Sequence, residues 1–339
     1  MAEETQFEQR LLQRIEDSMP LVREPYAQIA AELGCGETEL LAHLAGLRGE
    51  GGVIREISGI FDVSRLGYRQ SLVALAVPED RLDEAGRIVA AHPGVSHCYG
   101  RANEWNLWFT LAVSPASCLG LEGTVARLCE LCGARSQMIL PTLRQYKLRV
   151  RLAGQGEAAA AETPRAKPHV RGAQVQLDDA QRRAVAALQQ DLPNCTDPFA
   201  TLAKPVGMGA DELLVHAADM LAAGCLRRYS AVLHHLQAGF PANVMVVWQV
   251  GEAEADAAGA QCAQLPAISH CYVRPSSERW PYSLYTMIHG RNRQDCQMTV
   301  EEIVARTGML RRAELWTREE YKKQRVVLFS DEEAAWESR

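Results

Sequence analysis

One six-residue segment occurs twice in this chain, about half a chain length apart. Residues 96–101 read Ser-His-Cys-Tyr-Gly-Arg, and residues 269–274 read Ser-His-Cys-Tyr-Val-Arg. An aromatic-rich segment follows each copy, at 105–110 and at 280–286. A repeat over this distance predicts two copies of one domain pair, which would pack as an internal pseudo-dimer with one-to-one stoichiometry.

Residues 1–66 show the pattern of a winged helix-turn-helix domain. Apolar residues recur at helical spacing over 7–15, 26–33 and 37–50. Two glycines end the third helix, and residues 53–57 then read as a wing strand. Three short helices followed by such a strand are typical of this fold.

Residues 67–152 change to a pattern in which strands and helices alternate. We expect strands at 72–77, 94–101, 105–113 and 137–151, and helices at 81–91 and 117–132. The order βαββαβ is that of a ferredoxin-like domain, an antiparallel sheet with helices on one face. The other face must then be covered by something else, such as a partner sheet or a ligand.

The same order of elements returns after a linker. Residues 153–174 are rich in Ala, Gly, Pro and Glu and show no periodicity, which is typical of a linker. A second winged helix-turn-helix domain follows at 175–238 and a second ferredoxin-like domain at 239–330. Within them we expect helices at 177–190, 196–204, 210–223, 252–263 and 298–306, a wing at 225–233 and a strand at 244–250. The predicted fold class is α+β, two tandem copies packed as a pseudo-dimer.

The composition is that of an ordinary globular protein, with 47% hydrophobic and 23% charged residues. Residues 1–10 are polar and acidic, so we expect no secretory signal. No apolar run approaches the roughly 20 residues that a membrane helix needs. Of ten cysteines only Cys129 and Cys132 have a metal-type spacing, and we expect them to pack in a helix. We therefore expect a cytoplasmic protein with reduced thiols and no contact with membranes.

The predicted recognition helices carry the wrong charge for DNA. Reading base edges and holding phosphates requires Arg, Lys, Asn or Gln. The helix at 37–50 has Arg48 against three glutamates, and the helix at 210–224 has no Lys or Arg. Three wing arginines (Arg55, Arg227 and Arg228) are too few to compensate. With a net charge of -6, the chain is not expected to bind nucleic acid.

The repeated segments place reactive side chains on one face of a strand. Because alternate residues share a face, His97, Tyr99 and Arg101 project together, and so do their counterparts His270, Tyr272 and Arg274. Ser96, Cys98 and Gly100, which alternate with them, are small and suit the helix-covered face. An arginine recognises a carboxylate through two hydrogen bonds, and a histidine can donate a proton at neutral pH. The alternative is a packed histidine at a sheet interface, with the arginine neutralising an acidic neighbour.

Two further features distinguish the repeats. Aromatic residues such as Trp105, Trp108, Trp280, Tyr282 and Tyr285 are more often core than ligand-binding, but they also suit a planar ligand. His234, His235 and His289 have no counterpart in the first half, and His235 is the one we expect to be functional. One half would then hold the working site, with the other supporting it. The chain lacks a Walker motif, a GxGxxG loop, a GxSxG elbow and an HExxH motif.

The arrangement resembles the leucine-responsive/asparagine-regulator transcription family, and the motifs resemble its enzymatic branch, the siroheme decarboxylases, with both subunits fused. The resemblance covers all but the tails and the linker. It is carried by 59–62, 66–68, 97–101 and 106–110 in the first half and by 225–228, 235, 238–240, 243–248 and 270–290 in the second. Cys98, Gly100 and Ser283 depart from the family pattern, but no histidine or arginine of the motif is lost.

The resemblance implies a reaction. These enzymes convert siroheme to 12,18-didecarboxysiroheme, for the alternative haem pathway or for haem d1. The macrocycle serves as its own electron sink, so no cofactor is implied. His235 and His270 are implied as proton donors or iron contacts, with His97 as a further catalytic candidate. The implied substrate-binding residues are Arg274, Arg228, Arg101, Tyr272, Trp280, Tyr282 and Tyr285.

Two other functions remain open from the sequence. A transcription regulator that senses a haem-like effector would bind a specific duplex, which the acidic helices argue against. A haem carrier would bind siroheme without releasing CO2. Further association into a homo-oligomer is also left open, as are the order of the two decarboxylations and the choice between the two pathways.

Overall fold

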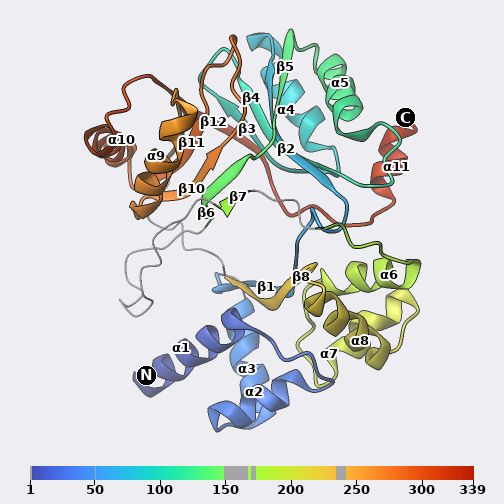
Figure 1. Cartoon of the computed structure of the whole chain (residues 1–339). Helices are drawn as coiled ribbons and strands as arrows, with labels where there is room; N and C mark the ends of the chain where they lie inside the picture. Colours follow the sequence, from blue (N-terminus) through green and yellow to red (C-terminus); the bar gives the residue numbers. More distant parts are fainter. Residues whose placement is uncertain (1, 50, 149–166, 169–172, 234–241) are drawn as a thin grey trace.

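The computed structural model describes residues 2–49, 51–148, 167–168, 173–233 and 242–339, and gives only the backbone for residues 2–5, 148, 167 and 168. The molecule has a helical layer and a sheet layer, and both halves of the sequence contribute to each (Figure 1). We call residues 1–152 the first half and residues 175–330 the second half. The α+β fold with two tandem copies of each domain is confirmed.

The first half follows the predicted order of elements. Its helices are α1 (Ala2–Asp17), α2 (Pro25–Leu33), α3 (Glu37–Arg48), α4 (Leu82–Ala90) and α5 (Gly120–Cys132), with a 3-10 turn η1 (Glu79–Arg81). Its strands are β1 (Ile54–Phe61), β2 (Arg69–Ala76), β3 (Val95–Arg101), β4 (Leu107–Val113), β5 (Ser136–Leu140) and β6 (Arg144–Leu148). Gly133 ends α5 with φ 62°, a left-handed conformation that costs glycine no strain.

The second half repeats this order. Its helices are α6 (Asp179–Leu188), α7 (Pro198–Ala203), α8 (Ala210–Ala222), α9 (Glu252–Gln264) and α10 (Arg293–Thr307), with a 3-10 turn η2 (Lys204–Val206). Its strands are β8 (Leu226–Leu233), β9 (Ala242–Trp248), β10 (Ile268–Val273), β11 (Leu284–Gly290) and β12 (Arg312–Lys323). Two elements were not predicted: β7 (Lys167–Pro168), inside the expected linker, and α11 (Glu332–Glu337), after the second half.

The two ferredoxin-like domains form one sheet, in the order β5-β2-β4-β3-β12-β9-β11-β10-β6-β7. The last strand of each half crosses to the other: β6 pairs with β10, and the second part of β12 pairs with β3. The single strand predicted at 137–151 is therefore wrong. The strand is interrupted between β5 and β6, because Pro141 has no amide hydrogen to donate to a neighbouring strand.

Two tyrosines at matching places hold this exchange together. Tyr146 of β6 lies against Gly259 of α9, and Tyr321 of β12 lies against Gly86 of α4. Each donates a hydrogen bond to an aspartate of the same helix, at 2.5 and 2.7 Å. A Cβ at either glycine would come within 2.6 Å of the ring, so only glycine admits the tyrosine of the other half. These reciprocal contacts, together with the continuous sheet, form the predicted pseudo-dimer.

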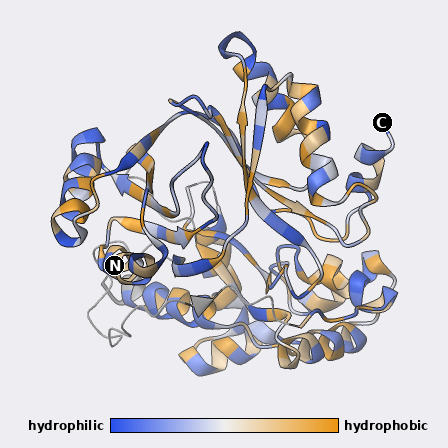
Figure 2. Ribbon diagram, turned by 45° about the horizontal axis from the view of Figure 1, so that its top comes forward, coloured by the Kyte–Doolittle hydropathy of each residue, from blue (hydrophilic) through white to orange (hydrophobic). Residues whose placement is uncertain are grey.

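Each sheet half is covered by helices on one face only. Helices α4 and α5 pack on the first half, and α9 and α10 on the second, with their apolar sides turned inward (Figure 2). The uncovered faces share a third core, formed by Ala74, Ala76, Trp105, Trp108, Leu140, Met245, Val247, Trp280, Tyr285 and Leu315. Residues of both halves therefore cover the face for which we expected a partner sheet or a ligand.

The helical layer is shared between the halves as well. The expected wings pair with each other as an antiparallel two-stranded sheet, β1 with β8, and Ser58 lies opposite Ser230. One apolar core contains buried residues from helices of both halves, including Leu11, Leu44, Leu188 and Leu213. The two helix-turn-helix domains are thus fused into one body beneath the large sheet (Figure 1).

The single arginine of α3 is not available to a DNA backbone. Arg48 Nη1 donates to the Leu192 carbonyl at 2.7 Å, and Nη2 lies 3.4 Å from Asp191, both in the other half. We expect no sequence-specific duplex binding at physiological salt, and fluorescence anisotropy with labelled duplexes would test this. Saturation below about 1 µM that weakens steeply with salt would contradict the expectation, since non-specific DNA binding is typically weaker than this.

The C-terminal helix packs on a buried histidine, His92, which is 0% exposed and lies 4.3 Å from the Trp336 ring. Burial lowers the pKa of His92 to about 4. Because the unfolded chain then binds more protons than the folded one between pH 6.5 and 4, stability should be complete above pH 6.5 and fall through that window. We expect a loss on the order of 3 kcal/mol, measured by denaturant unfolding at several pH values. In His92→Gln this part of the pH dependence should vanish.

Within the described ranges, no helix is both long and apolar enough to cross a membrane. The same part of the chain holds no group of three or more His, Cys, Asp or Glu residues arranged to bind a metal ion.

Candidate active site

Three imidazoles lie near one another on the sheet face that carries no helices. His97 projects from β3 and His270 from β10, at matching places of the two halves, while His289 projects from β11. Their neighbours Cys98 and Cys271 point into the helix-covered cores, so the predicted alternation holds for the histidines. His270 is close enough to both other imidazoles for their charges to lower its pKa. We call His97, His270 and His289 the histidine cluster.

The surroundings of the histidine cluster disfavour positive charge on the rings. Burial, followed by the charges of His289, His97 and Arg274, lowers the pKa of His270 to about 4. His97 is exposed, but desolvation by the surrounding protein and then the charge of Lys323 lower its pKa, although Glu320 acts in the opposite direction. The pKa of His289 is also lowered, by burial and Lys323. The pKa values of all three rings thus lie below the ordinary value, which favours the neutral form, and a bound polyanion would raise them.

In each repeat a serine hydroxyl contacts Nδ1 of the adjacent histidine ring. Ser269 Oγ lies 2.7 Å from His270 Nδ1, and Ser96 Oγ lies 3.0 Å from His97 Nδ1. The sequence predicted that Ser96 faces the helices, and this was wrong. The strand register shifts between Val95 and His97, and likewise in β10, so the serine is the extra residue of a β-bulge. The bulge lets its hydroxyl reach the adjacent histidine.

His289 completes the second-half arrangement, although the sequence pattern did not single it out as functional. Its Nε2 lies 2.8 Å from Ser269 Oγ, so one hydroxyl links two imidazoles. His97 lies opposite Thr110 and His270 opposite Met287, so two residues further along, Ala112 matches His289. The signal was present in the sequence as a histidine found in one half only, but the contact depends on the pairing of β10 with β11.

The strands flanking the two copies differ in charge. In the first copy, Lys323 and Glu320 of β12 lie opposite His97 and Tyr99. In the second copy, the uncharged Leu148 and Gln145 of β6 lie opposite His270 and Tyr272. The charges of Lys323 reach both His97 and His289. The two halves thus offer different electrostatic settings to the same motif.

Arginines of the wing strands lie near Arg325, and one of them also lies near His97. Arg55 of β1 acts on His97, and Arg55 and Arg228 both act on Arg325, which follows β12. Arg325 Nη1 is 2.7 Å from Glu56 and donates to Ser58 Oγ at 2.9 Å. We call Arg55, Arg228 and Arg325 the arginine group. Arg228 was predicted, whereas Arg55 was considered only for DNA and Arg325 was missed.

The two arginines of the repeat have a different setting from the one we expected. Arg101 Nη1 donates to the Leu315 carbonyl at 2.8 Å, and Arg274 Nη1 donates to the Leu140 carbonyl, so each reaches into the other half. Arg101 is 3% exposed, and burial lowers its pKa to about 10. These contacts brace the pseudo-dimer, and a role in binding carboxylates stays a prediction.

The aromatic residues lie further along the same face. Arg274 lies over the Tyr272 ring at 5.2 Å, and Tyr272 is half-buried beside His270. Trp280 and Tyr285 are only 4% and 2% exposed, and Trp280 Nε1 donates to Tyr285 Oη at 2.7 Å. Core packing covers the ring faces of both residues, which agrees with the more frequent role of such aromatics, and their part in binding substrate stays a prediction. Tyr282 is half-buried against the Trp280 ring.

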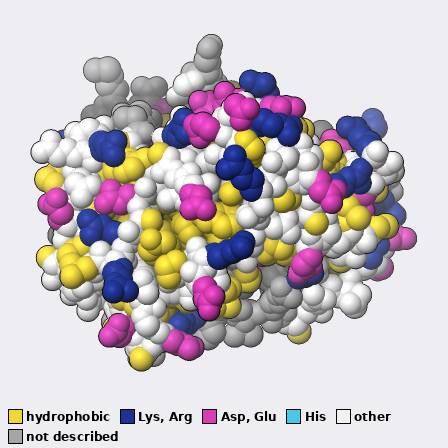
Figure 3. Space-filling view, turned by 90° about the horizontal axis from the view of Figure 1, so that it is seen from above, with side chains coloured by type: hydrophobic (Ala, Val, Ile, Leu, Met, Phe, Trp, Pro, Cys, Tyr) yellow, Lys and Arg dark blue, Asp and Glu magenta, His cyan; other side chains and the backbone are white. Residues whose placement is uncertain are grey.

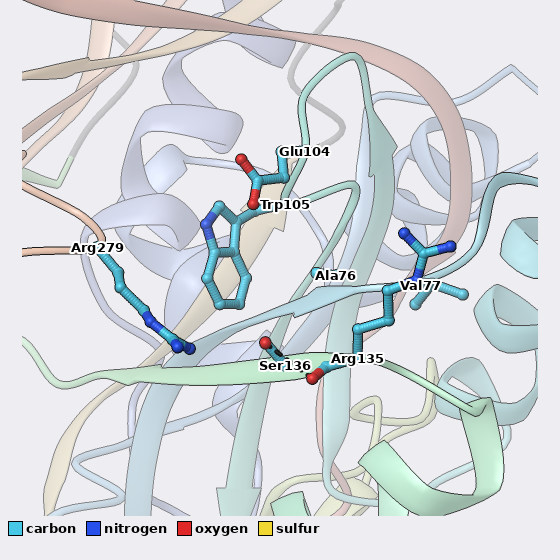
Figure 4. A pocket seen from close by; sticks show the side chains of 7 residues that line it. All are labelled: Ala76, Val77, Glu104, Trp105, Arg135, Ser136 and Arg279. Atoms are coloured by element: carbon cyan, nitrogen blue, oxygen red, sulfur yellow. Dashed lines mark hydrogen bonds between the residues drawn. The ribbon is translucent and has the colours of Figure 1, made fainter.

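A separate pocket of about 480 Å³ lies beyond the end of β2, lined by Ala76, Val77, Glu104, Trp105, Arg135, Ser136 and Arg279 (Figure 4). The figure shows Arg279 reaching toward Ser136 and Trp105 from the other half. His97 is level with Leu72 in the sheet and so lies away from this pocket. The face seen from above shows apolar side chains among charged ones and no histidine (Figure 3).

One predicted catalytic residue cannot be placed. His235, like His234, lies outside the residues that the structure describes. The strand before it, β8, carries Arg228 and ends at Leu233. In the sequence, His235 therefore comes two residues after the strand that carries Arg228.

Comparisons with known proteins cover almost the whole chain. Residues 65–147 and 237–322 match the AsnC-like ligand binding domain, and residues 8–55 and 181–227 match the siroheme decarboxylase NirDL-like HTH domain. A siroheme decarboxylase from Hydrogenobacter thermophilus is 35% identical over 327 residues, 96% of each chain. The siroheme decarboxylase NirDL subunit of Paracoccus denitrificans is 32% identical over 86% of this chain and 87% of its own.

Solved structures agree with these matches. The crystal structure of the siroheme decarboxylase NirDL superimposes with a TM-score of 0.81 at 32% identity, covering 97% of this chain and 96% of that one. A second NirDL structure, in complex with an iron-uroporphyrin III analogue, gives 0.82 at 31% identity, over 99% and 97%. With identity above 30% over nearly its full length, the chain belongs to the siroheme decarboxylase family.

Proposed function

We propose that this protein is a carboxy-lyase that converts siroheme to 12,18-didecarboxysiroheme. The observation that carries the proposal is the histidine cluster, whose His97 lies near Arg55 of the wing strand β1, a member of the arginine group. Siroheme is a planar tetrapyrrole with eight carboxylates, so its binding calls for several guanidinium groups. A solved relative, NirDL, has been crystallised with an iron-uroporphyrin III analogue, a similar polyanionic macrocycle.

The reaction needs acid and orientation from the protein. In each decarboxylation the bond between the methylene carbon and the carboxylate breaks, CO2 leaves, and the electron pair is delocalised into the macrocycle. A proton then adds to that carbon and turns the acetate into a methyl group. Two acetates thus consume two protons and release two CO2. Because the macrocycle accepts the electrons, no further cofactor is required.

The residues divide into two roles under this proposal. His270 and the neighbouring His97 deliver protons. His235 is the third donor or contacts the substrate iron. The arginine group holds carboxylates that stay, with Lys323 beside it, while Arg101 and Arg274 keep the two halves in register. Tyr272 lies next to His270 and contacts the edge of the tetrapyrrole. Binding of the polyanion raises the pKa values of the imidazoles, so the substrate itself favours the acid form of its donors.

The decisive experiment is an anaerobic incubation of purified protein with siroheme, followed by mass spectrometry of the pigment. We expect successive products that have lost one and then two molecules of CO2. A pigment that binds but keeps its mass would favour a carrier, and duplex binding that depends on the pigment would favour a regulator. We further propose that the protein works in the cytoplasm, where one chain supplies both halves of the site.

A further inference from the structure

The two copies of the repeated motif are not equivalent in their hydrogen bonding. In the second half Ser269 Oγ lies 2.7 Å from His270 Nδ1 and 2.8 Å from His289 Nε2. In the first half Ser96 Oγ lies 3.0 Å from His97 Nδ1. At the place of His289 the first half has Ala112, which cannot extend the chain of hydrogen bonds. A connected row of three side chains is thus present beside β10.

The row is rigidly held. Ser269 is 1% exposed, and the β-bulge fixes its direction. The His289 amide donates to the Ala267 carbonyl at 3.0 Å, which anchors the end of β11 on the chain before β10. With Nδ1 in contact with the serine, only Nε2 of His270 is left to meet a ligand on the sheet face that carries no helices. A ring fixed in this way has one orientation.

The other groups that face this row are cations and neutral residues. Arg274 and His97 act on His270, and Lys323 acts on His289. Leu148 of β6 lies opposite His270 in the sheet, whereas Lys323 of β12 lies opposite His97. The second copy therefore combines an uncharged flank with a second imidazole, and the first copy has neither.

We propose that Ser269 and His289 are positioning residues that orient His270 and pass protons to it, so that the second half supplies the acid for decarboxylation. This inference rests on the proposed function. His270 Nε2–H protonates the methylene carbon that CO2 has left, as Ser269 Oγ–H moves to His270 Nδ1. In the same step Ser269 takes the Nε2 proton of a His289 that solvent has protonated at Nδ1. The net change is one proton moved from His289 to the substrate carbon, with both imidazoles neutral afterwards.

The test compares matched substitutions in the two halves. Ser269→Ala and His289→Ala are expected to lower kcat for CO2 release by about 10- to 100-fold, with the siroheme Kd changed by less than about threefold. Ser96→Ala, the same change in the first half, should cost much less. Added imidazole should restore part of the activity of His289→Ala, and Ser269→Thr, which keeps the hydroxyl, should retain more activity than Ser269→Ala.

The outcomes separate the two proposals. If the unaltered protein releases no CO2 from siroheme, the proposed function fails. Two outcomes would overturn only the relay while the unaltered protein releases CO2 from siroheme. In the first, Ser269→Ala and Ser96→Ala lose equal activity. In the second, His289→Ala is fully active. A loss confined to siroheme affinity, or to the melting temperature with kcat intact, would also overturn the relay, because it would make Ser269 a binding or packing residue.

Discussion

Replacing His270 by alanine is expected to lower kcat for CO2 release by about 10²- to 10⁴-fold, the usual contribution of a general acid. The ring is held by Ser269 at Nδ1, so its Nε2 is the nitrogen that faces the substrate side. Siroheme affinity should change little, since the arginine group is untouched. Single-turnover mass spectrometry under anaerobic conditions would give the rate, and an absorbance titration would give the affinity.

The control for this substitution lies in the other half. His97→Ala removes the matching imidazole, which has a serine partner but no second histidine behind it. We expect a smaller loss of kcat than in His270→Ala. If His270→Ala keeps its full rate, His270 is not the acid. If His97→Ala is instead the more damaged variant, the first half supplies the proton.

The second large effect is expected from the arginine group. The double variant Arg55→Gln/Arg228→Gln should raise the siroheme Kd by about 10- to 100-fold for each carboxylate left without its guanidinium, since a charge-assisted hydrogen bond contributes about 1.5–3 kcal/mol. The dependence of affinity on salt should weaken at the same time. Absorbance titrations at two ionic strengths would measure both quantities.

Arg227 provides a matched control on the same strand. It is adjacent to Arg228, but its Nη2 is 2.8 Å from Asp62 Oδ2, so it is committed to an ion pair away from the arginine group. Arg227→Gln should leave the siroheme affinity within about twofold, as expected for an exposed pair. Equal weakening by Arg227→Gln and by the double variant would mean that only the overall charge matters. In that case the arginine group would not be a carboxylate site.

Much of the architecture followed from local pattern. Helical and strand periodicities placed nearly every element, because 3.6-residue and two-residue repeats report directly which side of an element is buried. The acidic recognition helices and the repeated His-x-Tyr-x-Arg face also needed only the sequence. Chain geometry alone sets the alternation of a strand, so the shared face of His97 and Tyr99 was readable without the fold.

The errors occurred where distant segments meet. Periodicity could not show that β6 leaves its own domain, because pairing with β10 is a contact between segments more than one hundred residues apart. The sequence left Trp280 and Tyr285 open between core packing and ligand binding, and the meeting of the two sheet halves buries both. Both outcomes depend on which surfaces the pseudo-dimer brings together.

The order of residues is enough to show that this protein is built as two copies of one plan, with imidazoles repeated on one strand face and cations nearby. Which of these groups act together depends on the packing of the folded chain. A β-bulge turned Ser269 to His270, the pairing with β11 brought in His289, and the wing strands brought Arg55 and Arg228 close to Arg325. Such contacts are set by register and by packing between segments far apart in the chain, and neither quantity is encoded in the spacing of residues along it.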